Sequence, residues 1–136
     1  MTSFDHRLRP RGAMAITPYL TIINAAATIE FLKKAFNAIE LSVINLADGK
    51  IRHAELMIDD SMIMLSDATE KYPAMPGMYY LYVADVDVAY QHALTAGAIS
   101  LIPPTDQMYG DRTAGLQDPG NNQWWLASPI KAAVNR

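Results

Sequence analysis

An internal repeat restricts the fold of this chain more than any other feature of its sequence. At a shift of about 60 residues, Thr21-Ile22-Ile23 falls on Leu81-Tyr82-Val83, and Arg52-His53-Ala54-Glu55-Leu56 falls on Arg112-Thr113-Ala114-Gly115-Leu116. Self-similarity at a fixed shift indicates a duplicated supersecondary unit. Few residues are identical, so the matching positions of strands, helices and turns carry the argument. We therefore expect two copies of one small module in a single domain.

Each half is predicted to contain a strand, a helix and then three more strands. In the first half, β-branched and aromatic runs indicate strands, and apolar residues at the helical period indicate a helix that Asn24 caps. The strands are expected at residues 16–23, 41–46, 51–58 and 61–66, and the helix at residues 25–36. In the second half, the strands are expected at residues 78–83, 99–102, 111–117 and 123–128, and the helix at residues 85–96.

These elements predict an α+β fold built from two βαβββ modules. Module one is expected at residues 15–67 and module two at residues 78–130, with a proline-containing linker at residues 68–77. A flexible amino-terminal arm is expected at residues 1–14, which are polar and show no periodicity. Residues 15–130 are therefore expected to form one domain.

The composition narrows the classes of function. A net charge of -3 and a pI near 5.5 do not indicate the excess of basic residues that binding to nucleic acid or an anionic membrane requires. The chain has no cysteine, which removes disulfides, thiolate metal sites and cysteine nucleophiles. No apolar stretch is long enough for a signal peptide or a membrane span, so a cytoplasmic location is the default expectation. Charged residues make up only 18% of the chain, and we expect a homodimer that covers part of this lightly charged surface.

Several short motifs, taken in order, resemble one known superfamily. They are Tyr19-Leu20-Thr21-Ile22, Glu30-Phe31-Leu32-Lys33-Lys34-Ala35-Phe36, His53-Ala54-Glu55-Leu56, Met64-Leu65-Ser66-Asp67, Tyr82-Val83-Ala84-Asp85-Val86-Asp87, Gly110-Asp111-Arg112 and Asp118-Pro119 with Trp124-Trp125. The chain resembles the glyoxalase, bleomycin-resistance and extradiol-dioxygenase superfamily (vicinal oxygen chelate fold), in its PhnB-like branch. The resemblance implies that the two modules' sheets curl into an open, barrel-like arrangement around a cavity, commonly in a dimer.

The resemblance also implies where a metal ion would bind. Enzymes of the superfamily hold a divalent ion on four inward-facing side chains, typically His, Glu or Gln. Matching the strands places these positions at Thr17, Met64, Met78 and Trp125. A thioether is soft and neutral, an indole is only a donor, and one hydroxyl cannot hold a metal. We therefore expect no metal at this place, and no other cofactor.

Strand alternation predicts which side chains line the concave side of the sheets. They are aromatic, thioether and a few polar residues: Thr17, Tyr19, Thr21, Met62, Met64, Met78, Tyr80, Tyr82, Gln123 and Trp125. Such a lining suits a planar or hydrophobic organic molecule, although the same residues serve equally well as the filling of a small barrel. Tyr109 and Arg112 are expected at the cavity mouth, where Arg112 either holds an acidic group of a ligand or forms an ion pair within the loop or across a dimer interface.

His53 and Glu55 are the candidate catalytic residues, because a spacing of two along a strand points both to one face. They form an acid–base pair, or two ligands of a displaced metal site whose third ligand is Asp67, Asp106 or Asp111. The third interpretation is a structural network with a neighbouring strand or with Arg112.

The sequence favours metal-independent binding or sequestration of a small hydrophobic or aromatic molecule, such as a drug or antibiotic. The alternative is a glyoxalase- or dioxygenase-like enzyme that uses His53 and Glu55, with or without a divalent metal. A dimeric domain with no ligand of its own is the third hypothesis. Whether the protein is an enzyme stays open at this point.

Overall fold

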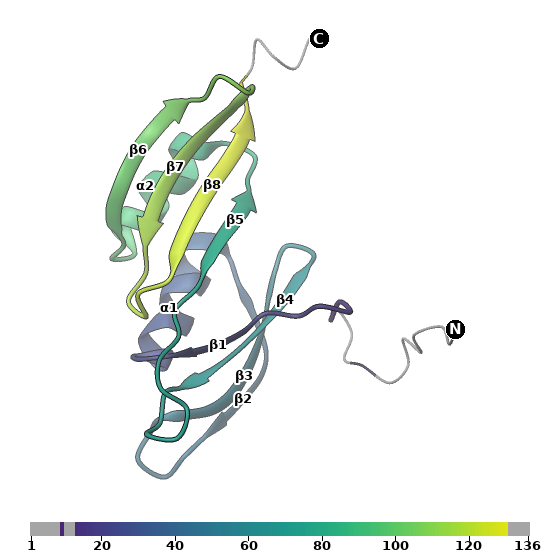
Figure 1. The fold of residues 1–136 in the computed structure, drawn as a ribbon, viewed down its shortest axis with the longest axis vertical. Coiled ribbons are helices and arrows are strands. Elements are labelled where there is room, and N and C mark those ends of the chain that lie inside the picture. Colours follow the sequence, from purple (N-terminus) through teal and green to yellow (C-terminus); the bar gives the residue numbers. More distant parts are fainter. Residues whose placement is uncertain (1–8, 10–12, 131–136) are drawn as a thin grey trace.

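The computed structural model, which describes residue 9 and residues 13–130, contains two four-stranded sheets with one helix each (Figure 1). Module one contains β1 (Tyr19–Ile22), α1 (Ala25–Phe36), β2 (Ile39–Asn45), β3 (Ile51–Ile58) and β4 (Ser61–Asp67). Module two contains β5 (Met78–Tyr82), α2 (Val86–Thr95), β6 (Ile99–Asp106), β7 (Asp111–Gln117) and β8 (Gln123–Pro129). The predicted α+β fold with two βαβββ units is confirmed. Across residues 13–130 the sheets do not close into a barrel. The arm expected at residues 1–14 lies almost wholly outside the described residues.

The two sheets have the same topology, which is the structural form of the sequence repeat. Their strand orders are β1-β4-β3-β2 and β5-β8-β7-β6, with the first pair parallel and the other pairs antiparallel in both sheets. Tyr19 pairs with Met64 in the first sheet, and Tyr80 pairs with Trp125 in the second. These two pairs therefore occupy equivalent places in the two modules.

One hydrophobic core joins the modules. It takes buried side chains from both halves, among them Leu20, Leu56 and Leu65 from module one and Leu116 and Leu126 from module two. Figure 1 shows α1 near the middle of the molecule, between the two sheets. The rings of Phe36 at the end of α1 and Trp124 on β8 lie 5.3 Å apart between centroids, so the helix of one module contacts the sheet of the other.

The helices begin in different ways. Asp85 accepts a hydrogen bond from the backbone N–H of Val88 (3.2 Å), which is an ordinary side-chain cap for α2. Asn24, predicted to cap α1, adopts a left-handed conformation (φ 53°) and makes no side-chain cap. The carboxylate of Asp67, at the end of β4, instead accepts from the N–H of Ala25 (3.1 Å).

Among the described residues, no helix is long and apolar enough to cross a membrane.

β6 is longer than the sequence predicted. The strand was expected to end at Ile102, because Pro103 and Pro104 cannot donate to a sheet ladder. It continues to Asp106, because it is the edge strand of its sheet and the pairing with β7 is irregular between Ile102 and Thr105. An edge strand tolerates proline where its missing donor would have faced away from the sheet.

Candidate functional site

Each sheet has one face covered by the core and an opposite face left open. Along β4, the buried residues Ile63 and Leu65 alternate with the partly exposed Met64 and Ser66. The module-one face consists of Tyr19, Thr21, His53, Glu55, Met64 and Ser66. The module-two face consists of Met78, Tyr80, Tyr82, Gly115, Gln123 and Trp125. These two faces hold most of the side chains that the sequence predicted for ligand contact.

The module-one face carries a chain of three hydrogen-bonded side chains. The Nε2 atom of His53 lies 2.9 Å from Oε2 of Glu55, and its Nδ1 atom lies 3.2 Å from the hydroxyl oxygen of Tyr19. The side chains of His53 and Glu55 are 28% and 19% exposed, and that of Tyr19 is half exposed. The predicted pairing of His53 with Glu55 is thus present in the geometry, while the bond to Tyr19 was missed.

A cavity of 830 Å³ opens beside Tyr19, which is within the range of roughly 300–1,000 Å³ that is typical of small-molecule sites. It lies between β1, the start of β3, the end of β4 and the loop that follows β4. Its lining consists of Tyr19, Thr21, Leu46, Asp48, Lys50, Ile51, Arg52, Ser66, Asp67, Ala68, Thr69, Glu70 and Tyr72. Residues 68–72 were predicted only as linker. No local motif signals their position, because they are held by long-range bonds such as that from the N–H of Ala68 to the carbonyl of Ile22 (2.7 Å).

The module-two face is aromatic. The rings of Tyr80 and Tyr82 meet edge to face at 5.3 Å, and the indole of Trp125 lies over Gly115. A Cβ atom at position 115 would come within 2.7 Å of that indole, so the glycine is what allows the ring to lie against β7. Met78, Tyr80 and Tyr82 are 66%, 47% and 69% exposed, which leaves their apolar surfaces open to solvent.

Tyr80 is the most electrostatically perturbed group of this face. Its hydroxyl donates to Oδ2 of Asp111 over a long 3.4 Å and is also hydrogen-bonded to Tyr109, which lies at the predicted mouth. Desolvation, followed by the bond to Tyr109 and the charge of Asp111, raises the pKa of Tyr80 far above its ordinary value. The hydroxyl therefore keeps its proton throughout the neutral range and acts as a donor within the chain.

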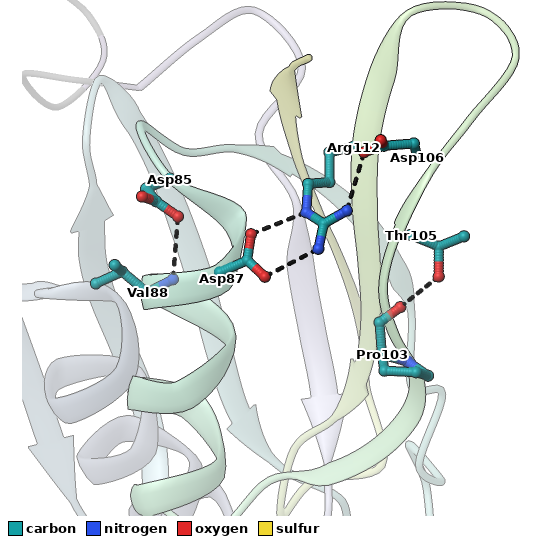
Figure 2. Close-up of polar contacts among 7 residues, drawn as sticks. All are labelled: Asp85, Asp87, Val88, Pro103, Thr105, Asp106 and Arg112. Atoms are coloured by element: carbon teal, nitrogen blue, oxygen red, sulfur yellow. Dashed lines mark hydrogen bonds and ion pairs between the residues drawn. The ribbon is translucent and has the colours of Figure 1, made fainter. Parts of the chain in front are cut away.

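Arg112 lies away from the module-two face. Figure 2 shows its guanidinium between Asp87 of α2 and Asp106 of β6. Its Nε and one terminal nitrogen donate to the two oxygens of Asp87 at 2.8 and 3.0 Å, and the other terminal nitrogen donates to Asp106 at 2.9 Å. The hydrogen bond from Arg112 lowers the pKa of Asp87. The sequence left open an ion pair within the loop or across a dimer interface. The structure instead pairs Arg112 with Asp87 of α2 and Asp106 of β6, and it gives no support to the predicted ligand contact.

Met62 is the other predicted lining residue that presents no surface to a ligand. It is 1% exposed, although its neighbour Met64 on the same strand is partly open. Strand alternation assigns a side to a residue but not the depth to which its neighbours cover it.

The four positions that the superfamily resemblance assigns to a metal do not fit one here. Met64 and Met78 offer thioethers, Trp125 offers an indole, and the hydroxyl of Thr17 donates to the carbonyl of Met14 (2.8 Å). Within the part of the chain that the structure describes, no group of three His, Asp or Glu side chains could hold an ion.

The carboxylates proposed as a third ligand are engaged elsewhere. Asp67 accepts from the N–H groups of Ala25 and Ile51, and Asp106 pairs with Arg112. Asp111 lies beside Tyr80, in the other sheet from His53 and Glu55.

Comparison with known proteins gives a family model and several related folds. The model described as "Glyoxalase/Bleomycin resistance protein/Dioxygenase superfamily" matches residues 15–126. An uncharacterized protein of Mycobacterium tuberculosis is 35% identical over 128 residues, which cover 86% of this chain and 75% of that protein.

Two solved structures share the fold. TioX from Micromonospora sp. ML1 superposes with a TM-score of 0.68 at 22% identity, covering 86% of this chain and 97% of TioX. TnmS3, an antibiotic binding protein from Streptomyces sp. CB03234, superposes with a TM-score of 0.66 at 20% identity, covering 86% of this chain and 99% of TnmS3. At such identities the likeness is one of fold alone.

Proposed function

The chain belongs to the glyoxalase/bleomycin resistance protein/dioxygenase superfamily, and from that premise we propose that it binds a small aromatic or hydrophobic molecule without a metal ion. The superfamily predicted from the sequence motifs is thereby confirmed. Its PhnB-like branch is part of the proposal and rests on the motif His53-Ala54-Glu55-Leu56 together with the other segments of the resemblance. A drug or antibiotic is the class of ligand that we favour, since TnmS3, with the same fold, is an antibiotic binding protein.

The open aromatic surface of the module-two face is the observation that carries this proposal. Soluble proteins rarely leave adjoining aromatic and thioether side chains exposed unless they bind something. Tyr80, Tyr82 and Trp125 offer stacking faces with hydrogen-bonding tips, and Met78 adapts its shape to a partner. A planar organic molecule satisfies all of these side chains at once.

We also propose that the binding form is a homodimer. Both sheet faces are open, and the edge strands β2 and β6 expose further large apolar residues, including Ile39, Leu41 and Ile99. A second copy that covers these surfaces would remove them from water and would enclose a ligand against the faces. Sedimentation velocity tests this part: a dimer is expected, and a monomer at every concentration would contradict it.

A calorimetric screen of planar aromatic compounds tests the binding function. We expect saturable binding, with affinity lowered by about fivefold in Tyr82→Ala, because a stacked aromatic contact contributes roughly 1 kcal/mol. Val88→Ala is the matched control, since Val88 is an exposed apolar residue on α2 and lies outside both faces. Folded protein that binds none of the compounds, or that loses affinity equally in both variants, would contradict the proposal.

An enzyme that uses His53 and Glu55 is the second candidate. The 2.9 Å contact between them favours it, because a carboxylate that holds one imidazole nitrogen leaves on the other a lone pair that can take a proton, and this nitrogen faces the Tyr19 hydroxyl at 3.2 Å. Metal analysis and thermal melting with added divalent ions separate its two forms. A stoichiometric ion that is lost in His53→Ala would favour the metal-dependent form over the binding function.

A further inference from the structure

We propose that Tyr19 selects ligands that donate a hydrogen bond, namely aromatic molecules with a hydroxyl or amino substituent, because its own proton is committed to His53. This inference rests on the proposed binding function and deepens it by naming the chemical group that the module-one face recognises. It follows from the order of donors and acceptors along Tyr19, His53 and Glu55.

The carboxylate of Glu55 determines which nitrogen of the His53 imidazole carries the hydrogen. An ionised carboxylate only accepts hydrogen bonds, so the nitrogen that faces it must carry hydrogen. Oε2 of Glu55 lies 2.9 Å from Nε2 of His53, so in the neutral form of the ring Nε2 is the nitrogen that carries the hydrogen. Nδ1 is left with a lone pair and becomes an acceptor.

The hydroxyl of Tyr19 supplies the donor that Nδ1 requires. The Tyr19 oxygen lies 3.2 Å from Nδ1, and the two rings are tilted by 38° with centroids 5.6 Å apart. A phenol has one hydrogen, so the Tyr19 oxygen keeps lone pairs and has no proton left to give. Toward any molecule that reaches it, Tyr19 acts as an acceptor.

A ligand can reach this oxygen, because Tyr19 is half exposed and lines the 830 Å³ cavity. Thr21 and Ser66 line the same cavity, and they keep hydroxyl groups able both to donate and to accept. The bond to His53 thus makes the hydroxyl of Tyr19, on the cavity wall, a hydrogen-bond acceptor toward a ligand. Its ring provides a stacking face while its oxygen requires a donor beside it.

Tyr82 of the module-two face provides the contrast. Its ring contacts Tyr80, and its position relative to a strand face is like that of Tyr19, but no side chain of the described residues fixes the direction of its hydroxyl hydrogen. A ligand donor or a ligand acceptor can therefore meet Tyr82 equally well. Removing its hydroxyl should not change which of the two is preferred.

The test compares two probes that differ at one group, 6-hydroxyquinoline and 6-methoxyquinoline. Both accept hydrogen bonds, but only the first donates from its oxygen. We expect wild-type protein to bind 6-hydroxyquinoline about tenfold more tightly in calorimetry, as one hydrogen bond allows. The extra methyl group would favour the methoxy probe on hydrophobic grounds alone, so this preference runs against the nonspecific trend.

Substitution of His53 separates this role from a structural one. In His53→Leu the Tyr19 hydroxyl is free to turn and donate, so the preference for the hydroxy probe should fall to about twofold or less. Tyr82→Phe, the control, should keep the wild-type ratio. A merely structural His53 would weaken both probes by the same factor and leave the ratio unchanged.

The outcomes separate this inference from the function on which it rests. If wild-type protein binds both probes equally or prefers the methoxy probe, or if His53→Leu keeps the ratio, the selectivity assigned to Tyr19 is wrong while binding stands. If neither these probes nor any other aromatic compound binds, both the function and the inference are overturned.

Discussion

The two modules share a topology and a core but differ on their open faces. Ala54 and Leu56 of β3 and their counterparts Ala114 and Leu116 of β7 are all fully buried. On the other side of the same strands, His53 and Glu55 of module one correspond to Thr113 and Gly115 of module two. Met64, opposite Glu55, likewise corresponds to Trp125, opposite Gly115. The repeat has kept the residues that specify the fold and has changed those that a ligand would meet.

That comparison predicts equal losses at equivalent core positions. Leu56→Ala and Leu116→Ala should each lower the free energy of unfolding by about 2–5 kcal/mol, because each removes a wholly buried side chain and leaves a cavity. Urea denaturation followed by circular dichroism measures both. A near-neutral effect in one module alone would break the claim that the two halves share one core.

The turns that precede the last strand of each module should differ sharply in how much they contribute to the free energy of unfolding. Asp118 is buried, and its carboxylate accepts from the N–H groups of Gly120 and Asn122, the amide of Asn122 and the indole N–H of Trp124. Asp118→Ala leaves these donors without a partner, and we expect a loss of about 3 kcal/mol.

Asp60, in the corresponding turn of module one, is the control for this prediction. It is exposed and accepts from the hydroxyl of Ser61, so Asp60→Ala should stay within about 0.5 kcal/mol of wild type. Similar losses in the two variants, measured by urea denaturation, would show that the two turns contribute alike.

Gly115 sharpens the comparison of the two faces. Gly115→Ala places a methyl group against the indole of Trp125, so the ring must move, at a cost of about 1–3 kcal/mol in stability. The tryptophan emission should shift at the same time. Adding Trp125→Ala should remove most of the cost, since the obstacle is then gone. A Gly115→Ala protein with wild-type stability and emission would contradict the close contact of ring and strand.

Arg112 gives the smallest expected effect. Arg112→Ala breaks its exposed bonds to Asp87 and Asp106, and we expect a slight drop in melting temperature that disappears at high salt. Its ion pair lies on the side of β7 that faces α2, so affinity for aromatic ligands should stay at the wild-type value (Figure 2). Loss of ligand affinity in this variant, with the fold intact, would support the sequence-based prediction that Arg112 contacts the ligand.

Local sequence patterns were sufficient to predict most of the fold. Helix α1 and strands β3 and β7 have the predicted bounds, because apolar periodicity and turn residues are local signals. β6 was cut short at Pro103, since sequence alone does not show that a strand lies at a sheet edge. The cap of α1 was assigned to Asn24, although the actual acceptor, Asp67, comes from a distant strand.

The candidate site was predicted less completely, because its contacts join distant segments. The alternation of β3 placed His53 and Glu55 on one face, but the bond between Tyr19 and His53 depends on the parallel pairing of β1 with β4. Arg112 was expected at the cavity mouth, holding either a ligand or an ion pair, because it lies in a glycine-containing loop. Its actual direction follows from Asp87, which lies 25 residues earlier in the chain.

The most direct test of the central claim is a nitrogen-15 NMR titration of chelator-treated protein with the tightest compound from an aromatic library. Trp125 lies on the module-two face, whereas the indole N–H of Trp124 is buried against Asp118 (2.8 Å) and serves as an internal reference. We expect the Trp125 indole signal and the amides of Tyr80 and Tyr82 to shift with saturation while the Trp124 signal stays in place. No shift with any compound, or shifts confined to α1 and α2, would contradict the claim that the open sheet faces bind an aromatic molecule without a metal.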